Sequence, residues 1–218
     1  MLEAMLDRRG PLRLLAVGCH ADDIEIGCGG TILELAERRP DLEVTWLVLS
    51  ASGARANEAR ASAAGFLERV TSPAQVFVES FRDGFFPYDG AAVKERFERL
   101  KSEVSPDIIL THAGTDRHQD HRVACELTWN TFRDHLILEY EVPKWDADLT
   151  PTNVYVPVSE AAVQRKVELL LDNFPSQRDR HWFTDDLFRA LLRLRGMEAN
   201  SASGYAEAFH CRKLVLGA

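Results

Sequence analysis

The sequence has little cysteine and lacks the segments that direct a chain into or across a membrane. Its four cysteines, in 218 residues, are scattered and form no C-x-x-C pair. We therefore expect reduced thiols in a cytoplasmic protein and no cysteine-based zinc site. No run approaches the roughly 20 apolar residues of a membrane span. The first ten residues contain no apolar segment followed by a small-residue cleavage site, so no secretory signal is expected.

Basic side chains are also few relative to acidic ones. The counts are 26 against 34, a formal net charge of −8. An acidic chain repels phosphate backbones, so nucleic-acid binding is not expected. Hydrophobic residues make up 45% and charged residues 28%, which is ordinary for a globular protein and excludes whole-chain disorder. The length favours a single domain over residues 1–218, with residues 1–10 as a loose tail, and it is compatible with a homo-oligomer.

Apolar runs alternate with stretches of helical spacing along the chain. The runs predict strands over 12–18, 43–50, 75–79, 107–111, 153–158 and 209–216, the last at a sheet edge. The helical spacing predicts helices over 31–39, 58–69, 91–104, 123–138, 160–172 and 185–195, the last ending before Gly196. This alternation predicts an α/β, Rossmann-like three-layer fold with a mainly parallel sheet and helices on both faces.

Two loops at the expected binding edge carry metal-binding side chains. In α/β folds, ligands bind where loops leave the carboxyl ends of the strands. Residues 20–23 (HADD) follow the first predicted strand, and residues 118–121 (HQDH) lie in the loop after the fourth. His20 and Asp23, at i and i+3, can grip one ion, and His121 would be the third ligand. Two histidines and one carboxylate leave a position open for water, as in catalytic zinc sites.

The other residues of these loops suit the chemistry of such a site. Asp22 would point away from the ion and could take a proton from an attacking water. His118 could donate to a developing oxyanion, and Asp120 could fix the tautomer of a histidine. Each loop taken singly is as typical of turns and helix caps. A metal-dependent phosphoesterase and a non-catalytic sugar- or nucleotide-binding protein stay open as alternatives.

Two other functions find no support. Gly27 to Gly30 (GCGG) invites a dinucleotide site, but G-x-G-x-x-G needs glycine where Ile32 stands. The acidic residue expected after the second strand of such a site is also missing. No G-x-S-x-G elbow is present, so acyl-enzyme chemistry is not indicated.

The two loops resemble the motifs of the PIG-L/LmbE-like family of zinc-dependent N-deacetylases. The family's first motif is usually His-Pro-Asp-Asp, and residues 20–31 here read HADDIEIGCGGT. Its second is usually His-Pro-Asp-His, and residues 118–121 read HQDH. Ala21 and Gln119 thus replace prolines, which carry no chemistry. Weaker likenesses at 55–58 (RANE), 176–177 (SQ) and 205–209 (YAEAF) extend the resemblance over most of the chain.

The resemblance implies a hydrolase that removes the acetyl group from an N-acetylated amino sugar, such as an N-acetylglucosaminyl glycoside or conjugate. It implies one zinc ion per chain and a set of residues around it: metal ligands His20, Asp23 and His121, and catalytic residues Asp22 (general base), His118 and Asp120. It also implies that Arg55 and Asp83 contact the sugar, for which a helix-start arginine and a turn aspartate are the alternatives. His112, His181, Glu207 and His210 receive no role.

Overall fold

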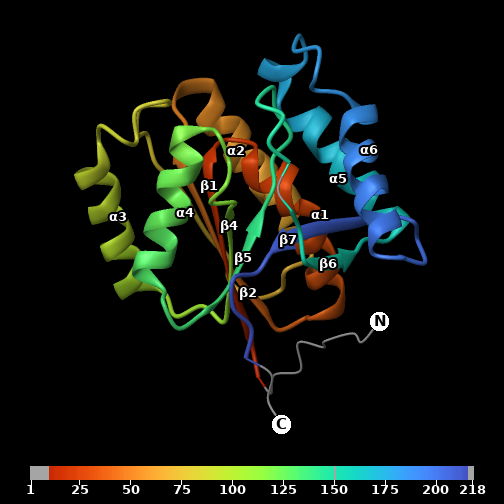
Figure 1. Ribbon diagram of the computed structural model, residues 1–218, viewed down its shortest axis with the longest axis horizontal. Coiled ribbons are helices and arrows are strands. Elements are labelled where there is room, and N and C mark those ends of the chain that lie inside the picture. The colour runs from red at the N-terminus through yellow and green to blue at the C-terminus, as the bar shows by residue number, and fades with distance from the viewer. Residues whose placement is uncertain (1–9, 150, 216–218) are drawn as a thin grey trace.

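A seven-stranded sheet runs through the middle of the computed structural model, which describes residues 10–149 and 151–215 (Figure 1). Its strands are β1 (Leu12–His20), β2 (Leu42–Ser50), β3 (Gln75–Val78), β4 (Ile108–His112), β5 (Leu136–Tyr140), β6 (Val154–Pro157) and β7 (Ala206–His210). The order across the sheet is β3-β2-β1-β4-β5-β7-β6. The five strands from β3 to β5 are parallel, and β7 runs antiparallel to both its neighbours.

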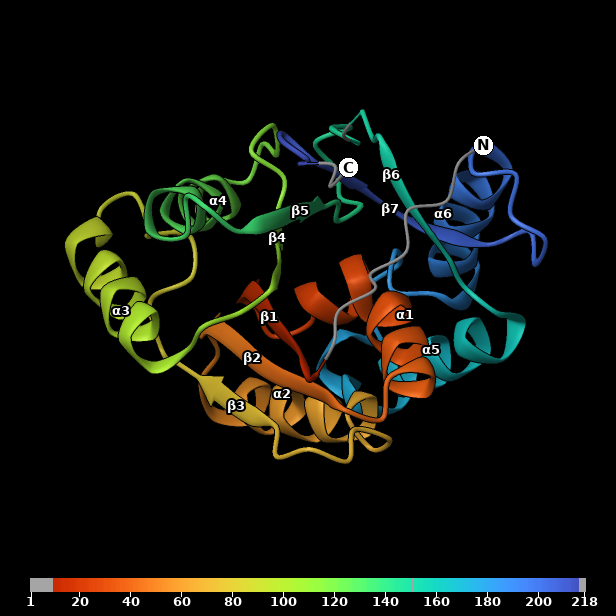
Figure 2. The same cartoon turned by 90° about the horizontal axis from the view of Figure 1, so that it is seen from below.

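Helices cover both faces of this sheet, as predicted (Figure 2). They are α1 (Asp23–Arg38), α2 (Gly53–Phe66), α3 (Gly90–Glu103), α4 (Gln119–Thr131), α5 (Glu160–Asn173) and α6 (Asp185–Glu198), with a 3-10 turn η1 at Pro175–Gln177. Side chains of β1 alternate between two cores: Leu14 and Ala16 pack with α1, α2 and α5, whereas Leu15 and Val17 pack with α3 and α4. Burial on both faces explains why this strand reads as a continuous apolar run. No helix within the described ranges is both long and apolar enough to cross a membrane.

The second half of one predicted helix is wrong. The helix expected over 123–138 begins at Gln119 and ends at Thr131, and Leu136–Tyr140 forms β5, paired in parallel with β4. A short apolar run such as 136–138 (LIL) fits a buried strand and a buried helix equally well, so periodicity does not separate them. The pairing with β4, which lies far away in sequence, decides for the strand.

Predictions near the C-terminus also need correction. The strand expected over 209–216 is β7 at Ala206–His210, and it lies between β5 and β6 rather than at an edge. Residue 216, like residues 1–9 of the predicted tail, lies outside the described part. Helix α6 continues through Gly196 to Glu198. Gly196 does not end the helix. It allows the helix to pack closely against Gly204, since a Cβ at position 196 would lie 2.1 Å from the carbonyl oxygen of Gly204.

Helix α1, which carries much of the first motif, is anchored by a buried ion pair. Glu207 of β7 accepts hydrogen bonds from the backbone N–H groups of Gly30 (2.7 Å) and Thr31 (2.6 Å) and from Nζ of Lys166 (2.7 Å). Lys166, on α5, also donates to the carbonyl oxygen of Ile26 at 2.7 Å. Both charged side chains are buried. Gly30 is needed here, since a Cβ would lie 2.9 Å from Oε1 of Glu207. The pair thus joins α1, α5 and β7.

We predict that Glu207→Ala lowers the free energy of unfolding by about 3–5 kcal/mol, because it leaves the buried Lys166 ammonium without its counter-charge. Urea denaturation followed by circular dichroism measures the change. Arg165→Ala is the matched control: it removes the exposed pair with Glu68, which is worth less than about 1 kcal/mol. Equal stability of the Glu207→Ala variant and the parent would contradict this role.

Candidate metal and catalytic site

The two motif loops meet because β1 and β4 are adjacent parallel strands. From β1 the chain proceeds through β2 and β3 to one side of the sheet, and through β4 and β5 to the other. The carboxyl ends of β1 and β4 therefore form the switch point of the sheet, where α/β proteins bind their ligands. His20 ends β1 and Asp23 begins α1, while His118 is the N-cap of α4 and His121 lies in its first turn.

Three predicted ligand atoms converge at this point. Nδ1 of His20 lies 3.2 Å from Oδ2 of Asp23 and 3.2 Å from Nε2 of His121, and the last two atoms are 3.4 Å apart. Ligand atoms about 2.0–2.1 Å from a tetrahedral zinc ion are separated by roughly 3.3–3.4 Å. The three separations and the donor set of two imidazoles and one carboxylate therefore fit a zinc ion.

A carboxylate that the sequence reasoning missed orients His121. Oδ2 of Asp116 lies 2.9 Å from Nδ1 of His121, and Oδ1 accepts the N–H of His118 at 2.7 Å. Nζ of Lys144 lies 2.8 Å from the same Oδ2. Burial alone would raise the pKa of Asp116, but its hydrogen bond with His121 and the nearby cations hold that pKa well below its usual range. A carboxylate behind a ligating imidazole is the usual support of a metal site. The sequence feature that could have identified this carboxylate is an aspartate five residues before His121.

His20 has its own carboxylate partners. Its Nε2 lies 3.0 Å from Oδ1 of Asp83 and 3.5 Å from Oδ2 of Asp120. Asp120 accepts hydrogen bonds from the backbone N–H groups of Gly84 (2.6 Å) and Phe86 (3.1 Å). Asp120, predicted to fix the tautomer of a histidine, thus holds the loop that carries Asp83 and faces His20. Asp83 contacts His20, a predicted ligand, and its side chain is 73% exposed. Its contact with a sugar stays a prediction.

His112 supports the site from the core. It is fully buried, its Nε2 accepts the N–H of Cys19 at 3.0 Å, and its ring stacks on that of His121 with centroids 3.8 Å apart. Burial and the charge of His121 lower the pKa of His112 to about 4, so the ring is neutral at neutral pH. These contacts indicate a structural role for this residue.

Asp22 and Arg55 form an ion pair beside the ligand atoms. NH2 of Arg55 lies 2.9 Å from Oδ1 of Asp22, and NH1 lies 3.1 Å from Oε2 of Glu58. The guanidinium also stands over the ring of Phe174, 5.4 Å from its centroid. Burial raises the pKa of Asp22, and the charge of Arg55 opposes part of that rise. Arg55, predicted as a sugar contact, is therefore held against the predicted general base.

His118 lies beside the two histidines predicted as ligands, and the three side chains offer ring nitrogens within 4.8 Å of one another. The ring centroid of His118 lies 4.8 Å from that of His20 and 4.6 Å from that of His121. Burial lowers the pKa of His118, and the charges of His121 and His20 lower it further. The imidazole is therefore neutral at neutral pH and retains an N–H that can be donated.

A cavity of about 600 Å³ opens over these residues. Its inner part is lined by the predicted ligands and by Asp22, Arg55, Asp83 and His118. Further lining residues come from positions 144–182, to which the sequence pattern pointed only weakly or not at all, and we call the end of the cavity that they form its outer end: Lys144, Trp145, Asp146, Gln177, Arg180 and Trp182. The volume lies within the range of pockets that hold drug-sized ligands.

Comparison with known families agrees with the motifs. Residues 15–132 match the family described as "PIG-L: GlcNAc-PI de-N-acetylase", and this range contains every site residue predicted from the sequence. The resemblance drawn from the two motifs is thereby confirmed. A search of curated proteins gave no match.

Solved structures share the fold at low sequence identity. The 4-carboxy-2-hydroxymuconate hydratase GalB from Pseudomonas putida KT2440 has a TM-score of 0.72 at 16% identity, over 95% of this chain and 98% of that one. An N,N'-diacetylchitobiose deacetylase from Pyrococcus horikoshii has a TM-score of 0.71 at 19% identity, over 91% and 83%. The A40926 pseudoaglycone deacetylase Dbv21 has a TM-score of 0.71 at 19% identity, over 94% and 99%. The predicted fold class is confirmed.

Proposed function

This chain belongs to the PIG-L family, and from that premise we propose that it is a zinc-dependent hydrolase that removes the acetyl group from an N-acetylated amino sugar. The observation that carries the proposal is the convergence of His20 Nδ1, Asp23 Oδ2 and His121 Nε2 beside a separate buried carboxylate, Asp22. Deacetylases of sugar-containing compounds share the fold, and so does a hydratase, so the fold alone does not choose between the reactions. The family match favours the amide substrate.

The residues of the chain divide the work of amide hydrolysis between them. His20, Asp23 and His121 would hold a zinc ion, which would supply a Lewis acid to polarise the carbonyl and acidify water. Asp22 accepts the proton of the water that attacks the carbonyl carbon. His118 donates its N–H toward the carbonyl oxygen as negative charge develops there. The C–N bond then breaks, and the proton held by Asp22 passes to the leaving amine, which gives acetate and the free amino sugar.

The two alternatives have less support. A two-metal phosphoesterase needs separate ligands for a second ion. Among the described residues, the groups of possible ligand atoms overlap: His20 belongs to one group with His118 and His121 and to another with Asp83 and Asp120, and His121 also belongs to a group with Cys19, Asp23 and His112. Asp22 is a buried carboxylate held beside the proposed metal ligands. A binding protein without catalysis has no use for such a group. Metal stoichiometry and product release separate these three functions.

We predict that the purified protein carries about one zinc ion per chain and that Asp23→Ala loses most of it, because Asp23 contacts both histidine ligands. Elemental analysis after gel filtration measures this. Asp146→Ala, which removes a carboxylate from the outer end of the same cavity, should keep the zinc. Two tightly held ions per chain would argue for the phosphoesterase.

We predict that Asp22→Asn keeps the zinc but lowers kcat for acetate release by roughly 10²–10⁴-fold, the usual contribution of a general base. A panel of N-acetylglucosaminyl compounds, with and without a chelator, provides the assay. Asp134→Asn changes an aspartate that is 93% exposed and outside the cavity, and it should leave kcat unchanged. Zinc-loaded parent protein that releases no acetate from the whole panel would refute the proposed function.

We predict that Arg55→Ala lowers kcat roughly 10- to 100-fold even on N-acetylglucosamine itself, because Arg55 holds Asp22 in place. Arg60→Ala, which changes an exposed arginine on the same helix, is the control. A rise in KM confined to larger glycosides, with normal kcat on the monosaccharide, would show instead that Arg55 acts only as a sugar contact.

A further inference from the structure

The outer end of the cavity has no part in the hydrolysis described above. It is formed by the loop 141–149 that follows β5 and by the connection 178–184 between η1 and α6, which lie close together at the top of Figure 1. The rings of Trp145 and His181 join the two segments, stacked with centroids 5.6 Å apart and an interplanar angle of 28°. Trp182 lines the same end and packs edge-on against Phe183 with centroids 5.4 Å apart.

Trp145 presents an apolar ring face at the mouth of the cavity. The residue is 75% exposed, whereas Trp46 in the core is fully buried. A single exposed hydrophobic residue is ordinary. This one differs because the stack with His181 fixes the plane of the indole and because the indole lines the cavity that holds the metal ligands. An indole held in this way is a surface on which another ring can stack.

Polar groups flank this ring surface. Asp146 offers a carboxylate acceptor, while Arg180 and Gln177 offer N–H donors. Lys144, which lines the same region, is already ion-paired: its Nζ lies 2.8 Å from Oδ2 of Asp116 and 2.7 Å from Oδ2 of Asp148. In contrast, neither Asp146 nor Arg180 forms an ion pair with any residue in the ranges 10–149 and 151–215. Their side chains are therefore available to a ligand.

We propose that this outer end binds a second sugar ring, linked to the N-acetylated sugar at the zinc site, so that the preferred substrate is a di- or oligosaccharide. The inference rests on the proposed function for its inner sugar. The apolar face of a pyranose stacks on Trp145, and its hydroxyl groups bond to Asp146 and Arg180. A purely aromatic group would also stack, but it would exclude water from Asp146 and Arg180 without giving them partners, which is costly.

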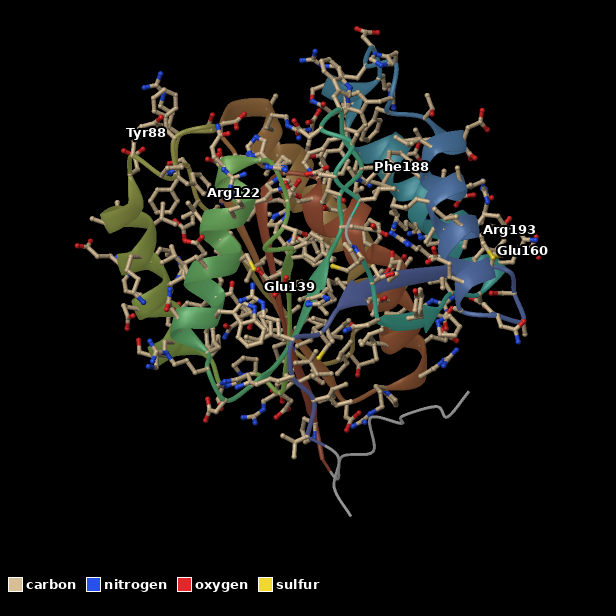
Figure 3. All side chains as sticks on the ribbon, in the orientation of Figure 1. Tyr88, Arg122, Glu139, Glu160, Phe188 and Arg193 are labelled. Atoms are coloured by element: carbon tan, nitrogen blue, oxygen red, sulfur yellow. The ribbon has the colours of Figure 1, made fainter. Side chains whose placement is uncertain are left out.

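The test compares three probes: N-acetylglucosamine, its 4-nitrophenyl glycoside and N,N'-diacetylchitobiose. We expect kcat/KM of the parent to be highest for the disaccharide. Trp145→Ala should lower that value roughly tenfold, and Trp145→Phe less, because a ring face remains. Neither variant should change the value for the monosaccharide. Tyr88→Ala is the matched control, since Tyr88 is 81% exposed but projects from the α3 side of the molecule, outside the cavity (Figure 3).

Two results would overturn the second-sugar site. One is an equal loss on the monosaccharide and the disaccharide in Trp145→Ala, and the other is a preference of the parent for the nitrophenyl glycoside over the disaccharide. Calorimetric titration of the Asp22→Asn protein, with and without Trp145→Ala, separates this question from hydrolysis. Tighter binding of the disaccharide that depends on Trp145 supports the site even if no acetate is released. Acetate release without such a difference in binding leaves the proposed function standing and removes the second-sugar site.

Discussion

The carboxylate of Asp23 is the group on which the arrangement of the site depends. It stands where β1 gives way to α1, and its Oδ2 accepts the N–H of His20 at 2.6 Å. The same oxygen lies within 3.4 Å of ring nitrogens of His20, His112 and His121. Burial would raise the pKa of Asp23, but the charges of His121 and His20 outweigh it and hold that pKa well below its usual range. One ionised carboxylate thus gathers residues from β1, β4 and α4 at the edge of the sheet.

A second layer of carboxylates connects these histidines to the wall of the cavity. His20 faces Asp83, and His121 faces Asp116. Asp116 in turn holds Lys144, the residue next to Trp145. The imidazole planes at the centre and the loop that forms the rim are therefore linked by consecutive short contacts. Asp116 thus contacts both a predicted metal ligand, His121, and Lys144 of the loop at the rim.

The helix that presents Asp23 is supported from behind. The N-terminus of α1 points at the site, while its middle is held by Glu207 and Lys166 through backbone groups. A buried ion pair of this kind adds little net stability compared with a well-packed apolar pair, but it tolerates no loss of one partner. It also favours glycine at position 30, because a Cβ there would lie 2.9 Å from Oε1 of Glu207, so that the hydrogen-bonded carboxylate would have to shift. The glycine-rich part of the first motif is thus explained by packing and not by phosphate binding.

The amino-acid sequence by itself determined the alternating α/β pattern and the two motif loops, and it predicted three metal ligands in them, because loops that follow parallel strands lie at one edge of the sheet. That the two loops meet was decided by the tertiary structure, in which β1 and β4 are neighbours. Only the tertiary structure decided that Leu136–Tyr140 is a strand, since the neighbour that it pairs with is remote in sequence. It also placed Asp120 against His20, Arg55 against Asp22, and Asp116 behind His121. These contacts, like the meeting of Trp145 with His181, depend on side-chain directions and on segments brought together across the fold, which the spacing of residues along one chain does not specify.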